Sequence, residues 1–224
     1  INLLFHVIPI SAFGGIVSCN FKITKNLAEE LNKKFFEVII ANGFDNNAIK
    51  VLKTKKNLRL IDGTGYKSEE PLKFSSFNEN IIVQSEDLNL FSKKNFKIVS
   101  KLKPTKKQLK NLIFAFNVCK YVKSNAIVLA SNETTVGIGS GQPSRLDSCQ
   151  IAINKMKKFN LQNDNLVAAS DAFFPFVDGI EKLVQSGVRA IVQPFGSIRD
   201  KEIIKFANET NTVLLFSKTR HFKH

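Results

Sequence analysis

The stretch LVAASDAFFPFVDGIEKLVQSGVRAIVQPFGSIRDKEIIKFANETNTVLLFS, residues 166–217, sets the fold class, because short apolar runs alternate in it with amphipathic stretches. The alternation predicts strands at 166–170, 189–194 and 212–217 and helices at 178–186 and 200–210. Regular strand and helix alternation is typical of an α/β sheet flanked by helices, with ligands at the carboxyl ends of the strands.

The same rhythm extends toward the N-terminus. Thr105 and Gln108 have the spacing of a capping box, which predicts a helix start. The elements predicted here are a helix at 106–122, a strand hairpin at 124–131 and 134–139, and a helix after Ser144. Further upstream, the pattern predicts helices at 25–35 and 45–54, strands at 37–41, 57–61 and 80–84, and a loop at 62–79.

Composition excludes several classes of protein. The chain has 224 residues, of which 43% are hydrophobic, so it can bury roughly 70% of its unfolded surface and is not disordered. No apolar run approaches the ~20 residues that span a bilayer. Cys19, Cys119 and Cys149 form no CxxC pair, which favours packing roles in a reducing cytoplasm over a disulfide scaffold.

The net charge of +14 leaves a nucleic-acid-binding protein as an alternative. Lysines cluster in KLKPTKKQLK, residues 101–110, but no aromatic residue interleaves them, so a solvated helix start is the favoured interpretation. Only five of the 33 basic residues are arginines, the residues that bind planar anions through two hydrogen bonds. We therefore look to the arginines for function.

Four segments carry residues that packing alone does not require. SAFGGIVS (11–18) has two glycines after an aromatic residue, which suits a tight turn or a close approach to a ligand. GIGSGQPSR (137–145) leaves a strand and places Arg145 in the first turn of a helix, as an anion site requires. A dinucleotide fingerprint is disfavoured because Gln142 stands where a third glycine is needed.

SDAFFPFVDG (170–179) is the third segment, and its phenylalanines form either core or the wall of a pocket for a flat ligand. Asp171 and Asp178 flank them and can accept paired N–H donors. PFGSIRD (194–200) and TRHFKH (219–224) follow two further strands, so they are expected at the same sheet edge. Arg199 and Asp200 also fit a plain surface ion pair.

These segments resemble a known family. SNAIVLA, GIGSGQPSR, SDAFFPF, GSIRD and the terminal RHFKH, in this order and spacing, are similar to the C-terminal part of the formyltransferase domain of the bifunctional AICAR formyltransferase/IMP cyclohydrolase family. SAFGGIV and EVIIA extend the resemblance back to about residue 9. AICAR is 5-aminoimidazole-4-carboxamide ribonucleotide.

The resemblance implies a fold, a reaction and partners. It implies cytidine-deaminase-like three-layer α/β subdomains with mixed sheets, residues 1–98 being the remnant of a first subdomain plus a connecting loop and 99–224 a second. It implies formyl transfer from 10-formyltetrahydrofolate to AICAR in a cytoplasmic homodimer with a composite site, binding neither nucleic acid nor membrane. The IMP cyclohydrolase domain is not expected in this sequence.

The resemblance also assigns residues by position. Asn125 and His224 are expected to be catalytic, although the family's principal Lys-His pair has no counterpart upstream of SAFGG, where His6 stands alone. Substrate binding falls to Phe13, Gly14, Glu37, Lys56, Asn125, Arg145, Arg220 and Phe222. Folate binding falls to Phe173, Phe174, Pro175, Phe176, Asp178, Gly196 and Ser197. Ser124 and Asp171 are candidates for a potassium site.

Some positions depart from the family pattern. Phe195 stands where a small residue is usual before GSIRD, so it is expected to crowd the folate. A deaminase-like metalloenzyme is a third hypothesis suggested by the subdomain fold, but the His/Cys zinc pattern with CxxC is absent from the sequence.

Overall fold

The computed structural model describes residues 13–66, 72–159 and 165–223. The chain divides into two compact units, unit 1 at residues 1–86 and unit 2 at residues 87–224. The boundary between these units lies at residue 86, and the assignment of 1–98 and 99–224 to two transferase subdomains stays a prediction.

Unit 2 is built on a six-stranded sheet in the order β6-β11-β10-β9-β7-β8. Its strands are β6 (Phe96–Ile98), β7 (Ile127–Ser131), β8 (Thr134–Gly139), β9 (Val167–Ser170), β10 (Ala190–Pro194) and β11 (Val213–Ser217). The strands β9, β10 and β11 run parallel, while β6, β7 and β8 each pair antiparallel with a neighbour. The α/β class with mixed sheets is therefore confirmed.

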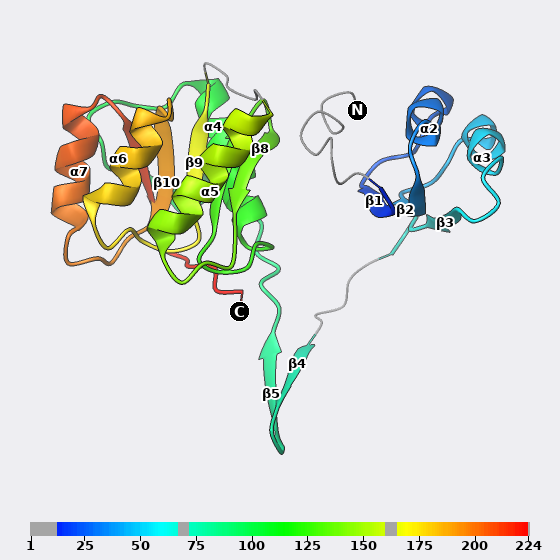
Figure 1. Ribbon diagram of the computed structural model, residues 1–224, viewed down its shortest axis with the longest axis horizontal. Coiled ribbons are helices and arrows are strands. Elements are labelled where there is room, and N and C mark those ends of the chain that lie inside the picture. Colours follow the sequence, from blue (N-terminus) through cyan, green and yellow to red (C-terminus); the bar gives the residue numbers. More distant parts are fainter. Residues whose placement is uncertain (1–12, 67–71, 160–164, 224) are drawn as a thin grey trace. The chain divides into compact units, whose positions relative to one another are not determined.

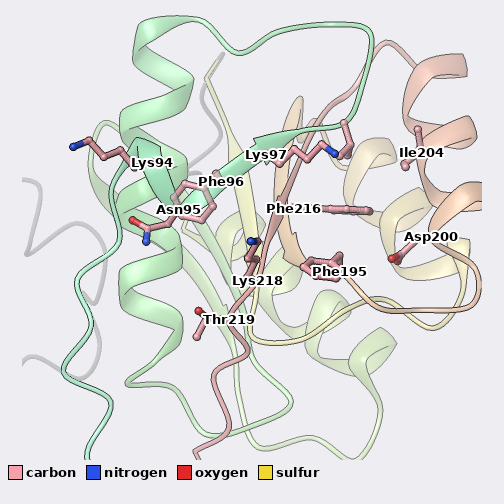
Figure 2. Close-up of a pocket in the computed structure, with 11 residues that line it drawn as sticks. Lys94, Asn95, Phe96, Lys97, Phe195, Asp200, Ile204, Phe216, Lys218 and Thr219 are labelled. Carbon is pink, nitrogen blue, oxygen red and sulfur yellow. The ribbon is translucent and has the colours of Figure 1, made fainter.

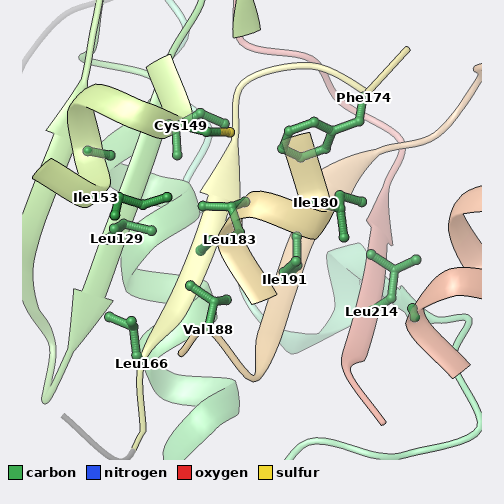
Figure 3. Packing of buried hydrophobic residues seen from close by; sticks show 14 of the residues in the cluster. Leu129, Cys149, Ile153, Leu166, Phe174, Ile180, Leu183, Val188, Ile191 and Leu214 are labelled. Carbon is green, nitrogen blue, oxygen red and sulfur yellow. The ribbon is translucent and has the colours of Figure 1, made fainter. Parts of the chain in front are cut away.

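Helices cover both faces of this sheet (Figure 1). They are α4 (Lys106–Cys119), α5 (Arg145–Lys158), α6 (Val177–Gln185) and α7 (Asp200–Glu209). Successive strand side chains point to opposite faces, so Leu129 joins the core under α5, α6 and α7 while Val128 joins the core under α4. Figure 3 shows the first of these cores, with Phe174 above Ile180. Burial on both faces explains the almost continuous apolar runs of the strands.

Two glycines of β8 let α5 pack against the strand. A Cβ atom at Gly139 would lie 1.9 Å from the Ser148 carbonyl oxygen, and one at Gly137 would lie 2.1 Å from the Ala152 carbonyl oxygen. No side chain fits at either position without displacing the helix. Gly137 and Gly139 of the GIGSG segment therefore have a packing role.

Unit 1 holds a smaller parallel sheet, in the order β1-β2-β3. Its elements are β1 (Gly15–Cys19), α2 (Lys25–Asn32), β2 (Phe36–Ala41), α3 (Asn46–Leu52) and β3 (Arg59–Asp62). A single core forms between the two helices and the sheet, with Ile23, Leu31 and Ile39 buried in it. The prediction of two α-helices followed by strands is confirmed here.

A hairpin contradicts the predicted loop at 62–79. The strands β4 (Leu72–Phe77) and β5 (Asn80–Ser85) pair antiparallel and join through Asn78, whose φ of 52° suits the turn. The segment reads as a loop because its serines and phenylalanines lack strand periodicity. Side chains of the hairpin remain exposed, among them Phe74 at 64% and Ile81 at 69%.

Other differences are local. The strand expected at 124–131 begins only at Ile127, since Ser124 and Asn125 use their polar groups in the loop before it. β1 and β6 carry no strand signal in the sequence and form by pairing with β2 and β11. The capping box is confirmed, with Gln108 N donating to Thr105 Oγ1 at 3.1 Å and Thr105 N donating to Gln108 Oε1 at 2.9 Å. None of the helices in the described ranges has the length and apolar character needed to cross a membrane.

Candidate functional site at the strand ends of unit 2

Five loops meet at one edge of the unit 2 sheet. The carboxyl ends of β9, β10 and β11 lie there because these strands run parallel. Since β7 is antiparallel to β9 and β8 is antiparallel to β7, the start of β7 and the end of β8 lie at the same edge. The topology therefore brings together segments 124–126, 140–145, 171–176, 195–199 and 218–223, which we call the strand-end site.

Arg145 is the centre of this site. Its Nε donates to Ser170 Oγ at 3.1 Å, its Nη1 donates to the Phe173 carbonyl oxygen at 3.1 Å, and its Nη2 donates to Asp171 Oδ1 at 3.0 Å and to Asn125 Oδ1 at 2.7 Å. The Arg145 side chain is 11% exposed, and that of Asp171 is fully buried. Four of the five guanidinium N–H groups are thus used, which leaves one on Nη1 for a ligand.

Asn125 is held equally firmly. Its Nδ2 donates to the carbonyl oxygens of Gln142 at 2.9 Å and Pro143 at 3.0 Å. Ser148 Oγ donates to the Asn125 carbonyl oxygen at 2.7 Å. Both amide hydrogens are used, while Oδ1 accepts one hydrogen bond from the described residues and retains a second lone pair among them. Asn125 can therefore accept a hydrogen bond from a ligand N–H.

Ser124 and Asp171, the expected potassium ligands, lie together. Ser124 Oγ donates to Asp171 Oδ2 in a short contact, and Asp171 N donates to the Ala126 carbonyl oxygen at 3.2 Å. Both side chains offer oxygen donors, the ligands that hard cations take. The Asp171 charge is already balanced by Arg145, so the pair is stable in the structure as it stands.

The FFPF segment divides between core and surface. Phe174 is 1% exposed and packs on α6, where a Cβ at Gly179 would lie 2.7 Å from its ring. The ring is thus enclosed by the core and offers no surface to a ligand in the described chain, and the role of Phe174 in a folate pocket stays a prediction. Phe176 is 52% exposed, and Phe173 is half-buried. Asp178 is exposed in the first turn of α6 and accepts from Gly179 N at 2.7 Å.

Two arginines lie over these surface rings. The Arg199 guanidinium is 4.9 Å from the Phe176 ring centroid, and the Arg220 guanidinium is 5.0 Å from that of Phe173. Arg199 also pairs with Glu202 at 3.1 Å, so the surface ion pair expected between Arg199 and Asp200 is replaced by this one. The loops after β9, β10 and β11 are thus joined by cation–π contacts.

Gly196 and Ser197 shape the loop after β10. Gly196 has a φ of 115°, and a Cβ there would lie 3.2 Å from Arg220 Nη2, so the glycine leaves room for that guanidinium. Gly196 N donates to Asp200 Oδ2 at 2.8 Å, and Arg199 N donates to Ser197 Oγ at 3.2 Å. Ser197 therefore supports its own loop.

His221 is a buried residue that the sequence analysis missed. Its Nδ1 lies 2.6 Å from Asp87 Oδ2, and its ring packs on Phe91 and Phe116. Burial lowers the pKa of His221 below its ordinary value, while the hydrogen bond to Asp87 opposes this effect. The only sequence signal was its place in RHFKH, where both neighbours were expected in the site. Phe222 is 53% exposed, and His224 lies outside the described residues.

Four of the expected substrate residues lie in unit 1. Phe13 is 79% exposed and packs on Phe35, with ring centroids 4.8 Å apart. Gly14 has a φ of 70°, and a Cβ there would lie 3.5 Å from the carboxylate of Glu37. Lys56 is exposed in the loop after α3. The close approach predicted for the glycine pair is thus an approach to Phe35 and Glu37.

A groove of about 720 Å³ lies beside the strand-end site (Figure 2). Phe96, Phe195 and Phe216 line it together with Lys94, Lys97 and Lys218. Phe195 is 47% exposed and forms one wall of this groove. The unusual phenylalanine before GSIRD therefore faces a cavity that it shares with β6 and β11.

The other candidate sites are a metal centre, the cysteine thiols and the lysine cluster. Within the described ranges, no group of three or more His, Cys, Asp or Glu side chains is arranged to hold a metal ion. Burial raises the pKa of the Cys149 thiol to about 12 and that of Cys119 well above its usual value. The lysines of 101–110 are exposed around the start of α4.

The fold and the site define the class: an α/β protein whose sheet edge offers arginines, an amide and exposed aromatic rings to a small polar ligand. A family model described as the AICARFT/IMPCHase bienzyme matches residues 5–155. The chain belongs to this family.

Curated relatives of this chain include proteins named PurH. The bifunctional purine biosynthesis protein PurH of Buchnera aphidicola subsp. Schizaphis graminum is 47% identical over 223 residues, which is 98% of this chain and 42% of that protein. PurH of Leuconostoc mesenteroides is 47% identical over 98% of this chain and 43% of its own length. PurH of Leptospira biflexa is 42% identical over 96% of this chain and 42% of its own length. The chain thus spans somewhat less than half the length of these curated relatives.

Proposed function

We propose that this chain contributes to a formyltransferase that moves the formyl group of 10-formyltetrahydrofolate to the 5-amino group of AICAR. Family membership supports the reaction class. The observation that carries the assignment within unit 2 is the Arg145 network, which leaves one N–H donor and one Asn125 lone pair at the strand-end site.

The substrate side of the proposal uses groups with unused bonding capacity. Asn125 Oδ1 would accept a hydrogen bond from the 5-amino group, and the remaining Nη1 hydrogen of Arg145 would donate to the carboxamide oxygen. Arg220 is exposed and lies over Phe173, so it would bind the 5′-phosphate, and Phe222 of the same segment would contact the nucleotide. For unit 1, we keep the roles that the resemblance assigns: Lys56 as a phosphate ligand, and Phe13, Gly14 and Glu37 as nucleotide contacts.

The folate side uses the surface members of the FFPF segment. Phe173, Pro175 and Phe176 would pack on the pterin ring, and the exposed carboxylate of Asp178 would accept its paired N–H groups. Gly196 and Ser197 would border the same ligand. Phe174 contributes indirectly, because its burial fixes the start of α6 and therefore the position of Asp178.

The chemistry requires a proton acceptor and an oxyanion donor. The amine nitrogen attacks the formyl carbon and the bond from that carbon to N10 of the folate breaks. One proton leaves the amine, and N10 gains one. We assign His224 to the proton transfer, while Asn125 holds the amine in line and Arg145 orients the neighbouring carboxamide.

Further parts of the proposal concern the cation and the assembly. Ser124 and Asp171 would hold potassium through oxygen atoms, and the ion, when bound, would supply positive charge beside the buried carboxylate. We also propose a homodimer with a composite site. A cytoplasmic location is proposed as well, and the three free cysteines of the described chain suit such a reducing compartment.

A titration with two ligands tests the proposal. Asp178→Asn should weaken binding of a 10-formyltetrahydrofolate analogue by about tenfold and leave AICAR binding within about twofold, because one charged acceptor is lost on the folate side alone. The measurement is isothermal titration calorimetry, with Asp147→Asn on the exposed start of α5 as the matched control. Equal losses for both ligands would refute the folate assignment.

A further inference from the structure

The terminal segment 218–223 carries one buried side chain between exposed ones. His221 is 2% exposed, whereas Phe222 is 53% exposed and Arg220 is also exposed. A buried side chain between two exposed ones attaches the backbone to the core at that point, so the anchoring of His221 restrains the positions of Arg220 and Phe222.

Four contacts hold His221. Its ring centroid is 5.0 Å from that of Phe91 in an edge contact and 4.6 Å from that of Phe116. Its Nδ1 and Asp87 Oδ2 are 2.6 Å apart. Its backbone N donates to the Asp171 carbonyl oxygen at 2.9 Å, so the residue reaches directly to the buried acid of the strand-end site.

The burial of the His221 Nε2 atom excludes a direct role in proton transfer to a substrate. His221 Nε2 is buried and has no hydrogen-bond partner in the part of the chain that the structure describes. A ligand at the strand-end site cannot reach a nitrogen enclosed by the core. The side chain is therefore placed to hold the backbone, not to exchange a proton with a substrate.

We propose that His221 is a positioning residue: the His221–Asp87 contact ties the terminal segment to the core and thereby sets the place of Arg220 at the strand-end site. The identity of the ligand as an anionic nucleotide rests on the proposed function, whereas the anchoring of the terminal segment by the His221–Asp87 contact rests on the contacts above. Arg220 in turn lies over Phe173 and against Gly196, so a loosened segment would move the guanidinium away from both.

A matched pair of variants isolates the tie. Asp87→Ala removes the acceptor, while Asp87→Asn keeps an oxygen in the same place. The Asp87 side chain is 34% exposed, so neither change opens a cavity in the core. His221→Phe is the third variant, since it keeps an aromatic ring between Phe91 and Phe116 and removes both the bond to Asp87 and the unpaired nitrogen.

Hydrogen exchange of the full chain gives the first readout. The Ser124 amide donates to the Lys223 carbonyl oxygen at 2.9 Å and reports whether the segment is docked. Asp87→Ala and His221→Phe should each speed its exchange by about tenfold, the effect of one lost hydrogen bond, and Asp87→Asn should not. Unchanged exchange in both of the first two variants would overturn the proposal.

A second readout separates positioning from simple stability. His221→Phe should keep the melting temperature, yet weaken AICAR binding by about fivefold while binding of the phosphate-free nucleoside stays the same, because Arg220 is assigned to the phosphate. Leu112→Ala, in the same core, is the stability control and should lower the melting temperature without this selectivity. Equal losses for nucleotide and nucleoside would contradict a positioning role. If the unaltered chain binds no AICAR, the proposed function fails, and the exchange measurement still decides the tie.

Discussion

The two units bury their sheets differently. Unit 2 encloses its sheet between α4 on one face and α5, α6 and α7 on the other, so its central strands are buried along their whole length. Unit 1 covers its sheet with α2 and α3 in a single core, and Ile16 and Ile61 remain 67% and 47% exposed. Hydrophobic stabilisation scales with buried apolar area, so we expect stability to be concentrated in unit 2.

The site follows the same division. In unit 2 the side chains of the candidate site are fixed by partly buried hydrogen bonds at the sheet edge. In unit 1 the expected ligand contacts, Phe13 and Lys56, are exposed side chains. The comparison predicts that changes at the unit 2 edge cost stability as well as binding, whereas changes in unit 1 cost little stability.

The largest effect should come from Arg145→Ala. This change leaves the buried Asp171 carboxylate without its cation, which should lower the free energy of unfolding by about 3–5 kcal/mol. Urea denaturation monitored by circular dichroism measures the loss. Arg199→Ala, whose ion pair is exposed, is the control and should stay within about 0.5 kcal/mol. A small loss at Arg145 would mean that Asp171 is not truly enclosed.

The same substitution, glycine to alanine, can be compared in the two units. Gly139→Ala forces a Cβ to within 1.9 Å of a helix carbonyl and should destabilise unit 2 by about 3 kcal/mol. Gly63→Ala in unit 1 meets nothing closer than 3.5 Å and should be tolerated. Thermal unfolding of both variants tests the contrast, and similar melting temperatures would contradict the close packing of α5 on β8.

Alkaline pH should act on unit 2 through Cys149. Its folded pKa of about 12 exceeds the ordinary value of 9.0, so the buried neutral thiol stabilises the fold fully below pH 9. Above pH 9 this contribution should fall by about 1.4 kcal/mol per pH unit until pH 12, since only the unfolded chain releases the proton. Urea titrations between pH 8 and about 10.5 measure the slope. Cys149→Ala should reduce the slope by about 1.4 kcal/mol per pH unit and leave the contribution of the buried Cys119 thiol, whose pKa is also raised. An unchanged slope would assign the effect to other groups.

The hairpin of unit 1 should give the smallest effect. Phe74→Ser and Ile81→Thr alter side chains that are 64% and 69% exposed, so each should change the free energy of unfolding by no more than about 0.5 kcal/mol. Melting curves of the chain at several concentrations check this. A larger, concentration-dependent loss would show that these side chains are covered in solution.

Much of unit 2 could be predicted because its strands and helices carry strong periodic signals. The helix start at Thr105 and the places of Arg145 and Asp171 at the strand ends followed from local patterns and strand order, whereas Asn125 came only from the family resemblance. The strand predicted at 80–84 is confirmed as β5, but the edge strand β6 and the strand β4 that pairs with β5 could not be predicted, because pairing partners rather than their own sequences stabilise them.

Side-chain direction limited the prediction of the site. Phe174 was grouped with Phe173 and Phe176, but the turn after β9 sends it into the core, and only Gly179 hints at this in the sequence. His221 was overlooked for the converse reason. Its partner Asp87 lies 134 residues away in the chain, a contact that no local pattern reveals.

The central claim is that the edge of unit 2 binds an anionic nucleotide through Arg220. Calorimetric titration of the chain with AICAR and with its phosphate-free nucleoside, in the unaltered protein and in Arg220→Ala, tests it most directly. The account predicts that the substitution weakens AICAR by about tenfold or more and leaves the nucleoside unchanged, because one charge-assisted contact to phosphate is lost. AICAR affinity that is the same with and without Arg220 would contradict the claim.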